Sequence, residues 1–169
     1  MTRLKDVINY HRNPVITTFT DETIRKLKSG FCYTYGYDRR YKPIIVLRAD
    51  RIDFKGNFQL TLNAYYYFML MIYHYRMVPY HAEKALFLID FGSVSLTSLP
   101  ILSLFDEFKK VGICYCGITE KTVLFNANSL GWIWKVISGF MNETQKRKIM
   151  LIGTGQEEKM LEFVDPDQL

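Results

Sequence analysis

Asp90 is the residue whose type and position best suit a catalytic group. Its carboxylate lies near the end of the apolar run Lys84–Phe91, so an enzymatic interpretation would start from it. Aspartate is also a turn former, whose oxygens accept hydrogen bonds from the backbone of the following loop. We expect this second role, because an enzyme would need a polar pocket with another titratable group beside Asp90.

The cysteines are the other candidates for chemistry. Cys114 and Cys116 form a Cys-x-Cys pair, which binds a metal only with two further ligands, and no histidine has a zinc-like spacing to it. The pair also lacks the nearby histidine or basic loop that would hold a reactive thiolate. With Cys32 the number of cysteines is odd and low, which predicts a reduced intracellular compartment. We expect no metal site.

Familiar catalytic motifs are missing from the sequence. It contains no glycine-rich phosphate loop, no Gly-x-Ser-x-Gly elbow and no His-Glu-x-x-His pair. We therefore predict a protein that is not an enzyme, with no catalytic residue and no cofactor.

Composition indicates a globular protein with a large core. The 169 residues are 49% hydrophobic and 15% aromatic, and the formal net charge is +5. No block of five like charges occurs, which excludes a nucleic-acid-binding tail. The start of the chain has no apolar signal segment, and Thr2 excludes myristoylation. A cytoplasmic protein is expected.

The most hydrophobic stretch, Leu60–Val78, is about as long as a membrane span. It nevertheless carries Asn63, His74, Arg76 and five tyrosines, so we predict a long buried helix that ends before Pro79. The run Lys84–Phe91 follows. Its continuous hydrophobicity is typical of a parallel strand buried on both faces.

The stretch Lys121–Gly153 predicts a strand, an amphipathic helix from Ser129, a short basic helix and a second strand, Ile149–Ile152. The helix from Ser129 is apolar over most of its circumference, which a helix with two apolar neighbours requires. One neighbour is the core. The other is more core, a membrane or a ligand, and an ordinary crossover helix over a sheet has the same pattern.

The string LFNANSLGWIWKVISGFMNETQKRKIMLIG resembles the core of the CRAL-TRIO lipid-binding family. The matching positions are Phe125-Asn126-Ala127, Gly139-Phe140-Met141-Asn142, Lys148-Ile149 and Gly153, in register without a gap. Asn128 and Gly139 replace the prolines that are usual in the family.

A second segment resembles the same family. A turn at Gly36–Asp38 and a short basic stretch lead to Tyr41-Lys42-Pro43, where the family usually has Gly-Arg-Pro, and then to a buried strand. The resemblance covers roughly residues 21–169. We predict an α/β fold whose mixed, mainly parallel sheet is flanked by helices. We divide the chain into a short polar, partly helical segment, residues 1–28, and a lipid-binding domain, residues 29–169.

The resemblance implies a mobile gate helix, residues 129–140, over an apolar cavity floored by the sheet. Hinges are expected at Gly131 and Gly139. Transfer proteins for phosphatidylinositol use a lysine, matched by Lys148, and a glutamate, whose position is held here by Gly117. The resemblance and the apolar pattern together predict these lipid-binding residues: Ala85, Phe87, Ile89, Phe125, Trp132, Trp134, Val136 and Lys148.

The expected partners are a phospholipid or other hydrophobic ligand and, transiently, a membrane surface, so the protein would be peripherally membrane-associated. The alternative is a protein-interaction module of the same fold. Large aromatic side chains such as Phe87, Trp134 and Tyr65 would then fill the cavity, and a protein partner or a homodimer would cover the apolar surface left by a shortened N-terminal lobe.

Overall fold

The computed structural model describes residues 20–168, apart from residues 55, 78–81, 93, 95–116, 128–130 and 140, and apart from the side chains of residues 132, 133, 136, 137 and 168. Several predictions lie outside this part of the chain. They concern the first nineteen residues, a helix expected at about residues 97–110, the Cys114/Cys116 pair and the ends of the proposed gate helix.

The chain alternates strands and helices. The strands are β1 (Cys32–Tyr37), β2 (Pro43–Arg48), β3 (Ala85–Asp90), β4 (Thr119–Phe125) and β5 (Ile149–Ile152). The helices are α2 (Asp21–Lys28), α3 (Phe58–Tyr75), α5 (Gly131–Gly139) and α6 (Glu143–Arg147). Short 3-10 helices are η1 (Ala49–Arg51), η4 (Glu157–Glu162) and η5 (Pro166–Gln168).

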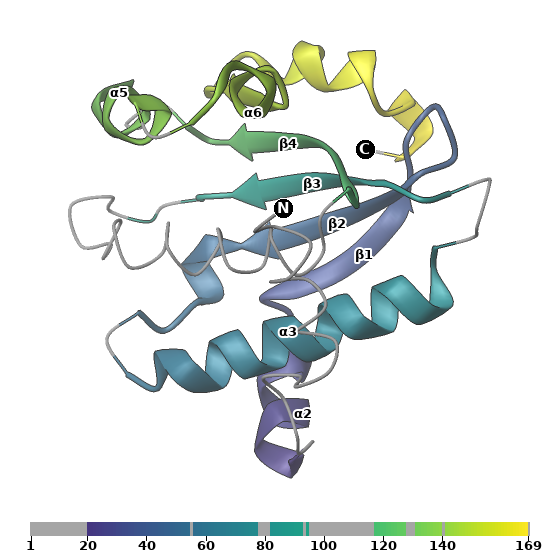
Figure 1. The fold of residues 1–169 in the computed structure, drawn as a ribbon, viewed down its shortest axis with the longest axis vertical. Helices are drawn as coiled ribbons and strands as arrows, with labels where there is room; N and C mark the ends of the chain where they lie inside the picture. The colour runs from purple at the N-terminus through teal and green to yellow at the C-terminus, as the bar shows by residue number, and fades with distance from the viewer. Residues whose placement is uncertain are drawn as a thin grey trace, which may run out of the picture.

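The five strands form one sheet in the order β1-β2-β3-β4-β5 (Figure 1). The hairpin β1–β2 is antiparallel, whereas β2, β3, β4 and β5 pair in parallel. The predicted α/β class with a mixed, mainly parallel sheet is confirmed. The continuous apolar run of β3 pairs in parallel on both sides, as its hydrophobicity indicated.

Side chains of the sheet alternate between two covered faces. One face packs against α3 and α2, and the other packs against the C-terminal segment that contains η4 (Figure 1). In β2, Ile45 and Leu47 point to α3, while Ile44 and Val46 point to the C-terminal segment. We call these the α3 face and the η4 face of the sheet.

Polar residues fix where the helices begin. The hydroxyl of Thr20 accepts a hydrogen bond from the amide of Thr23 (3.3 Å), and Asn57 accepts one from the amide of Leu60 (3.0 Å). α6 begins with a reciprocal capping box between Asn142 and Gln145. The long predicted helix forms as α3 and buries residues such as Met69 against the sheet.

The structure differs from the predictions in the end of one helix and in the type of another. α3 ends at Tyr75, before the predicted end at Val78. The sequence also predicts a short helix over residues 156–163, and the structure forms the 3-10 helix η4 over Glu157–Glu162 there. In the part of the chain that the structure describes, no helix combines the length and the hydrophobicity needed to cross a membrane.

Glu120, near the start of β4, ties three basic side chains together. Its carboxylate lies 3.0 Å from the ammonium of Lys42, 2.9 Å from that of Lys84 and 3.6 Å from the guanidinium of Arg40. The ammonium groups of Lys84 and Lys42 hold the pKa of Glu120 at about 2, below its usual 4.5. The network therefore connects the β1–β2 turn to the beginnings of β3 and β4.

We expect Glu120→Gln to lower the free energy of unfolding at pH 7, because it removes the carboxylate that pairs with the lysines. The expected loss is only roughly 1–2 kcal/mol, because the side chain is partly exposed. The pKa of Glu120 is lower in the folded state than in the unfolded state. Its contribution is therefore complete above about pH 5 and disappears as the pH falls toward 2. Urea unfolding of both proteins across this range measures the difference.

The matched control is Glu143→Gln, which removes an exposed ion pair with Lys146 within α6. We expect a change below about 0.5 kcal/mol. A Glu120→Gln effect as small as this, or one that persists unchanged at pH 3, would contradict the role of the network.

Candidate functional site

Part of the α3 face is only half-buried. α3 packs on side chains from β1, β2 and β3, and among the described residues no side chain of β4 or β5 belongs to that cluster. The register pairs Ile89 with Leu124 and Leu124 with Leu151, so these three side chains point to the α3 face. Thr122 and Ile149 lie beside them on the same face.

These five side chains form what we call the β4–β5 strip: Ile89, Thr122, Leu124, Ile149 and Leu151. All five are half-buried. The strip is nearly all apolar, continues the core beneath α3 toward the β5 edge of the sheet, and is the described surface best suited to an apolar ligand.

Three of the predicted binding residues share the α3 face. Ala85 is fully buried and Phe87 is 6% exposed, so both belong to the core beneath α3. Ile89 is half-buried and lies in the β4–β5 strip. These three predicted residues therefore lie on the same face of the sheet, but only Ile89 lies in the half-buried strip.

The structure does not bring Phe125 together with these residues. Phe125 pairs with Asp90 and Ile152, one position out of step with Leu124, and packs in the cluster of the η4 face. Successive side chains of a strand point to opposite faces, so Phe125 cannot share a floor with Ile89. The sequence alone missed Leu124 and Leu151, which the alternation within β4 and β5 would have indicated.

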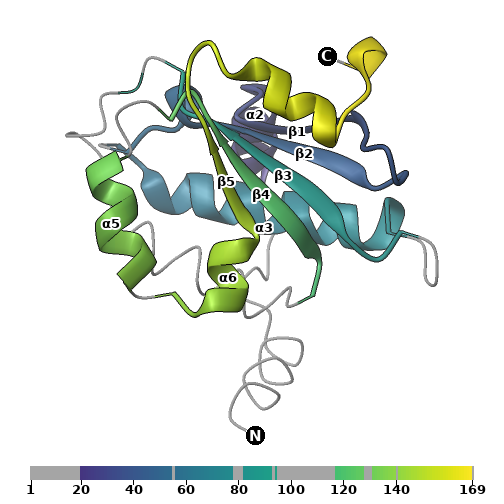
Figure 2. The same ribbon diagram turned by 90° about the horizontal axis from the view of Figure 1, so that it is seen from above.

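α5 carries the remaining apolar residues of the predicted site. It lies with α6 on the β5 side of the sheet (Figure 2). Trp134 is half-buried. Trp132 and Val136 belong to the same helix, but their side chains are outside the described part, so their role in the site stays a prediction.

Lys148 follows α6 and donates a hydrogen bond from its ammonium to the carbonyl of Thr119 (2.8 Å). The bond joins it to the segment just after Gly117, the position where the family resemblance implies a glutamate. Gly117 has φ +96°, a conformation that side chains other than glycine rarely adopt. A backbone constraint thus favours glycine at this position, whatever the headgroup.

Asp90 is held in a polar network at the carboxyl ends of β2, β3 and β4. Its Oδ1 accepts hydrogen bonds from the amide of Gly92 (2.9 Å) and from Nδ2 of Asn126 (2.7 Å). Its Oδ2 lies 3.4 Å from Nε of Arg48, which also pairs with Asp50. Both oxygens are engaged, which agrees with the turn-forming role expected for Asp90.

Asn126 explains one residue of the family-like motif. It adopts φ +56°, a left-handed conformation that asparagine tolerates better than most residues. Its amide also reaches Asp90 across the gap between β4 and β3. The residue after the strand therefore has both a conformational and a hydrogen-bonding reason to be asparagine.

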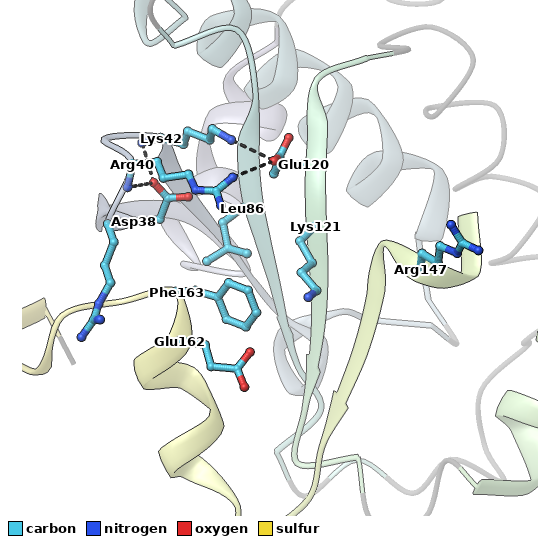
Figure 3. Close-up of a pocket in the computed structure, with 10 residues that line it drawn as sticks. Asp38, Arg40, Lys42, Leu86, Glu120, Lys121, Arg147, Glu162 and Phe163 are labelled. Atoms are coloured by element: carbon cyan, nitrogen blue, oxygen red, sulfur yellow. Dashed lines mark hydrogen bonds and ion pairs between the residues drawn. The ribbon is translucent and has the colours of Figure 1, made fainter. Parts of the chain in front are cut away.

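A second, charged pocket lies on the η4 face (Figure 3). Its volume is about 310 Å³. Ten residues line it: Asp38, Arg39, Arg40, Lys42, Leu86, Glu120, Lys121, Arg147, Glu162 and Phe163. It differs from the β4–β5 strip in both its face and its polarity, and no sequence motif indicated it.

Comparisons with known proteins agree with this architecture. The model of the CRAL/TRIO domain family matches residues 27–169. The crystal structure of Sfh5 superposes with a TM-score of 0.70 at 15% sequence identity, covering 91% of this chain and 60% of that chain. The chain thus spans about 60% of the length of the Sfh5 chain. No curated protein sequence matches the chain.

We expect Asp90→Ala to destabilise the fold by about 1–3 kcal/mol, because it leaves Asn126 and the Gly92 amide without their acceptor. Asp90→Asn keeps an oxygen acceptor and should cost less. Chemical denaturation of both variants, with exposed Asp167→Ala as the control, measures the effect. An Asp90→Ala protein as stable as the control would show that the network is not structural.

Proposed function

The chain belongs to the CRAL/TRIO domain family, and we propose that it binds a phospholipid or other hydrophobic ligand in an internal cavity and transfers or presents it at membranes. The β4–β5 strip carries this proposal. The strip is half-buried and apolar, and it continues the buried sheet residues beneath α3. Such a surface is suited to form the floor of a cavity for an acyl chain or another apolar group.

The energetics favour such a ligand. Each buried methylene of a lipid tail contributes about 0.8 kcal/mol. Leu124, Leu151 and Ile149 offer an aliphatic surface with no charge, whereas the charged pocket lies on the other face of the sheet. A tail on this surface would extend the core that Phe87 begins beneath α3.

We assign the gate to α5. Its Trp132, Trp134 and Val136 would cover the bound tail and, on opening, contact the membrane interface, where indole rings are favoured. A gate needs two arrangements of similar energy, for which Gly131 and Gly139 are the proposed hinges. The protein would then be cytoplasmic and associate with membranes only peripherally and transiently.

Headgroup choice rests on Lys148. Its ammonium is close enough to the start of β4 to bond the carbonyl of Thr119, so a headgroup phosphate would have to compete with that bond or share the ammonium. The partner glutamate is absent because Gly117 holds its position. We therefore propose a hydrophobic ligand without assigning its headgroup.

The competing function is a protein-interaction module whose cavity is filled by aromatic side chains. Three of the aromatic residues considered for this purpose, Tyr65, Tyr66 and Phe87, are buried in the core beneath α3. They fill the space between α3 and the sheet, and none belongs to the β4–β5 strip. This placement supports the lipid-binding proposal over the filled-cavity alternative.

Native mass spectrometry of the purified protein, followed by organic extraction and lipid analysis, tests the proposal. We expect one lipid molecule per chain, and we expect Leu124→Trp to reduce the bound fraction at least fivefold by occupying the floor. Leu161→Trp is the control, because Leu161 is exposed on η4. A bare protein that also fails to take up fluorescent phospholipids would favour the interaction module.

The gate assignment has its own test. We expect Trp132→Glu or Val136→Glu to abolish transfer of a fluorescent phospholipid between vesicles while circular dichroism and the melting temperature stay close to those of the wild type. Lys135→Glu on the same helix is the charge-changing control. Unchanged transfer by both gate variants would remove α5 from the mechanism.

A further inference from the structure

The charged pocket on the η4 face combines residues that are far apart in the sequence. The β1–β2 turn supplies Arg39, Arg40 and Lys42, β4 supplies Lys121, and α6 supplies Arg147. Five cations thus line a pocket that contains three carboxylates. The lining carries a formal charge of about +2, taking the acids and bases named for the pocket above.

The carboxylates do not neutralise these cations evenly. Glu120 forms ion pairs with Lys42 and Arg40. Arg39 pairs with Asp165, which does not line the pocket, at 3.0 Å between Nε and Oδ1. Asp38 is occupied differently, because its Oδ1 accepts two backbone amides of its own turn (2.8 Å each). Among the described residues, neither Lys121 nor Arg147 forms an ion pair.

Lys121 is the best placed of the unpaired cations. Its ammonium lies 4.5 Å from the centroid of the Phe163 ring, which orients the side chain toward the C-terminal segment. Figure 3 shows it between β4 and Phe163, on the same side as Arg40 and Lys42, with Arg147 apart at the margin on α6. Its three donors are not used by a carboxylate.

The walls of the pocket are held before any ligand binds. The amide of Arg39 donates to the carbonyl of Phe163 (2.8 Å), which joins the β1–β2 turn to the end of η4. Glu120 fixes Lys42 and Lys84 at the opposite wall. Such ties reduce the cost of ordering side chains when an anion binds.

From this geometry we infer that the η4-face pocket is an anion site for a phosphate group, with Lys121 as its main ligand. An ammonium without a carboxylate partner among the described residues, in an open pocket lined by further cations, suits phosphate oxygens. The sheet separates this pocket from the β4–β5 strip. The phosphate therefore belongs to a molecule other than the proposed cargo, either a lipid headgroup in a membrane surface or a free phosphate compound.

Two arms of one experiment separate these sources. The first titrates the protein with inositol trisphosphate and with inorganic phosphate by calorimetry. The second measures cosedimentation with phosphatidylcholine vesicles that contain one-fifth phosphatidic acid, against phosphatidylcholine vesicles alone. Binding in the first arm alone identifies a free phosphate compound, and binding in the second alone identifies a membrane headgroup.

The variants test the site itself. We expect Lys121→Gln to weaken binding about tenfold, because it removes one charge-assisted contact. Glu162→Gln removes an opposing carboxylate of the lining and should strengthen binding about two- to fivefold. Lys28→Gln, which removes an exposed charge on α2, is the matched control, and it should leave binding within twofold of the wild type.

Lipid carried through purification by the Lys121→Gln protein is measured alongside. Unchanged cargo with lost phosphate binding supports a site independent of the cavity. No binding of either probe by the wild type, or equal losses in the Lys121 and Lys28 variants, would overturn the anion site while leaving the cavity proposal intact.

Discussion

The parallel pairing of β2, β3, β4 and β5 is the constraint on which the rest of this structure depends. Parallel strands require crossover connections that place helices over a sheet, and strands covered on both faces must be apolar on both. α3 is the crossover between β2 and β3 and covers the sheet from β1 to β3, while α5 and α6 lie in the crossover between β4 and β5. Residues of η4 and the segment after it cover part of the other face.

Among the described residues, the cluster beneath α3 includes side chains of β1, β2 and β3 and none of β4 or β5, so α3 covers the two halves of the sheet unequally. The packed half contains fully buried residues such as Ile45 and Ala85. The other half contains Leu124 and Leu151, which are half-buried although their types favour burial.

Charge is distributed in a way that keeps two kinds of site apart. The α3 face of β4 and β5 offers aliphatic surface, while the η4 face near Lys121 collects cations around Glu120. One five-stranded sheet separates them, and a side chain that moves by one position along β4 changes from one face to the other. The proposed cargo and the proposed phosphate ligand would therefore bind on opposite faces of the sheet.

The sequence by itself determined the elements and the fold class. Hydrophobic periodicity, capping residues and the continuous apolar run of β3 are local signals, and the register of the family motif around Asn126 is local too. Only the tertiary structure decided which face each side chain uses. Strand pairing placed Phe125 on the face of the sheet away from Ile89. The tertiary structure also placed the ammonium of Lys148 on the carbonyl of Thr119 and gave position 117 a left-handed backbone that favours glycine. The charged pocket could not be predicted from the sequence, because its walls come from distant segments. Ion pairs between such segments leave no periodic pattern in the sequence.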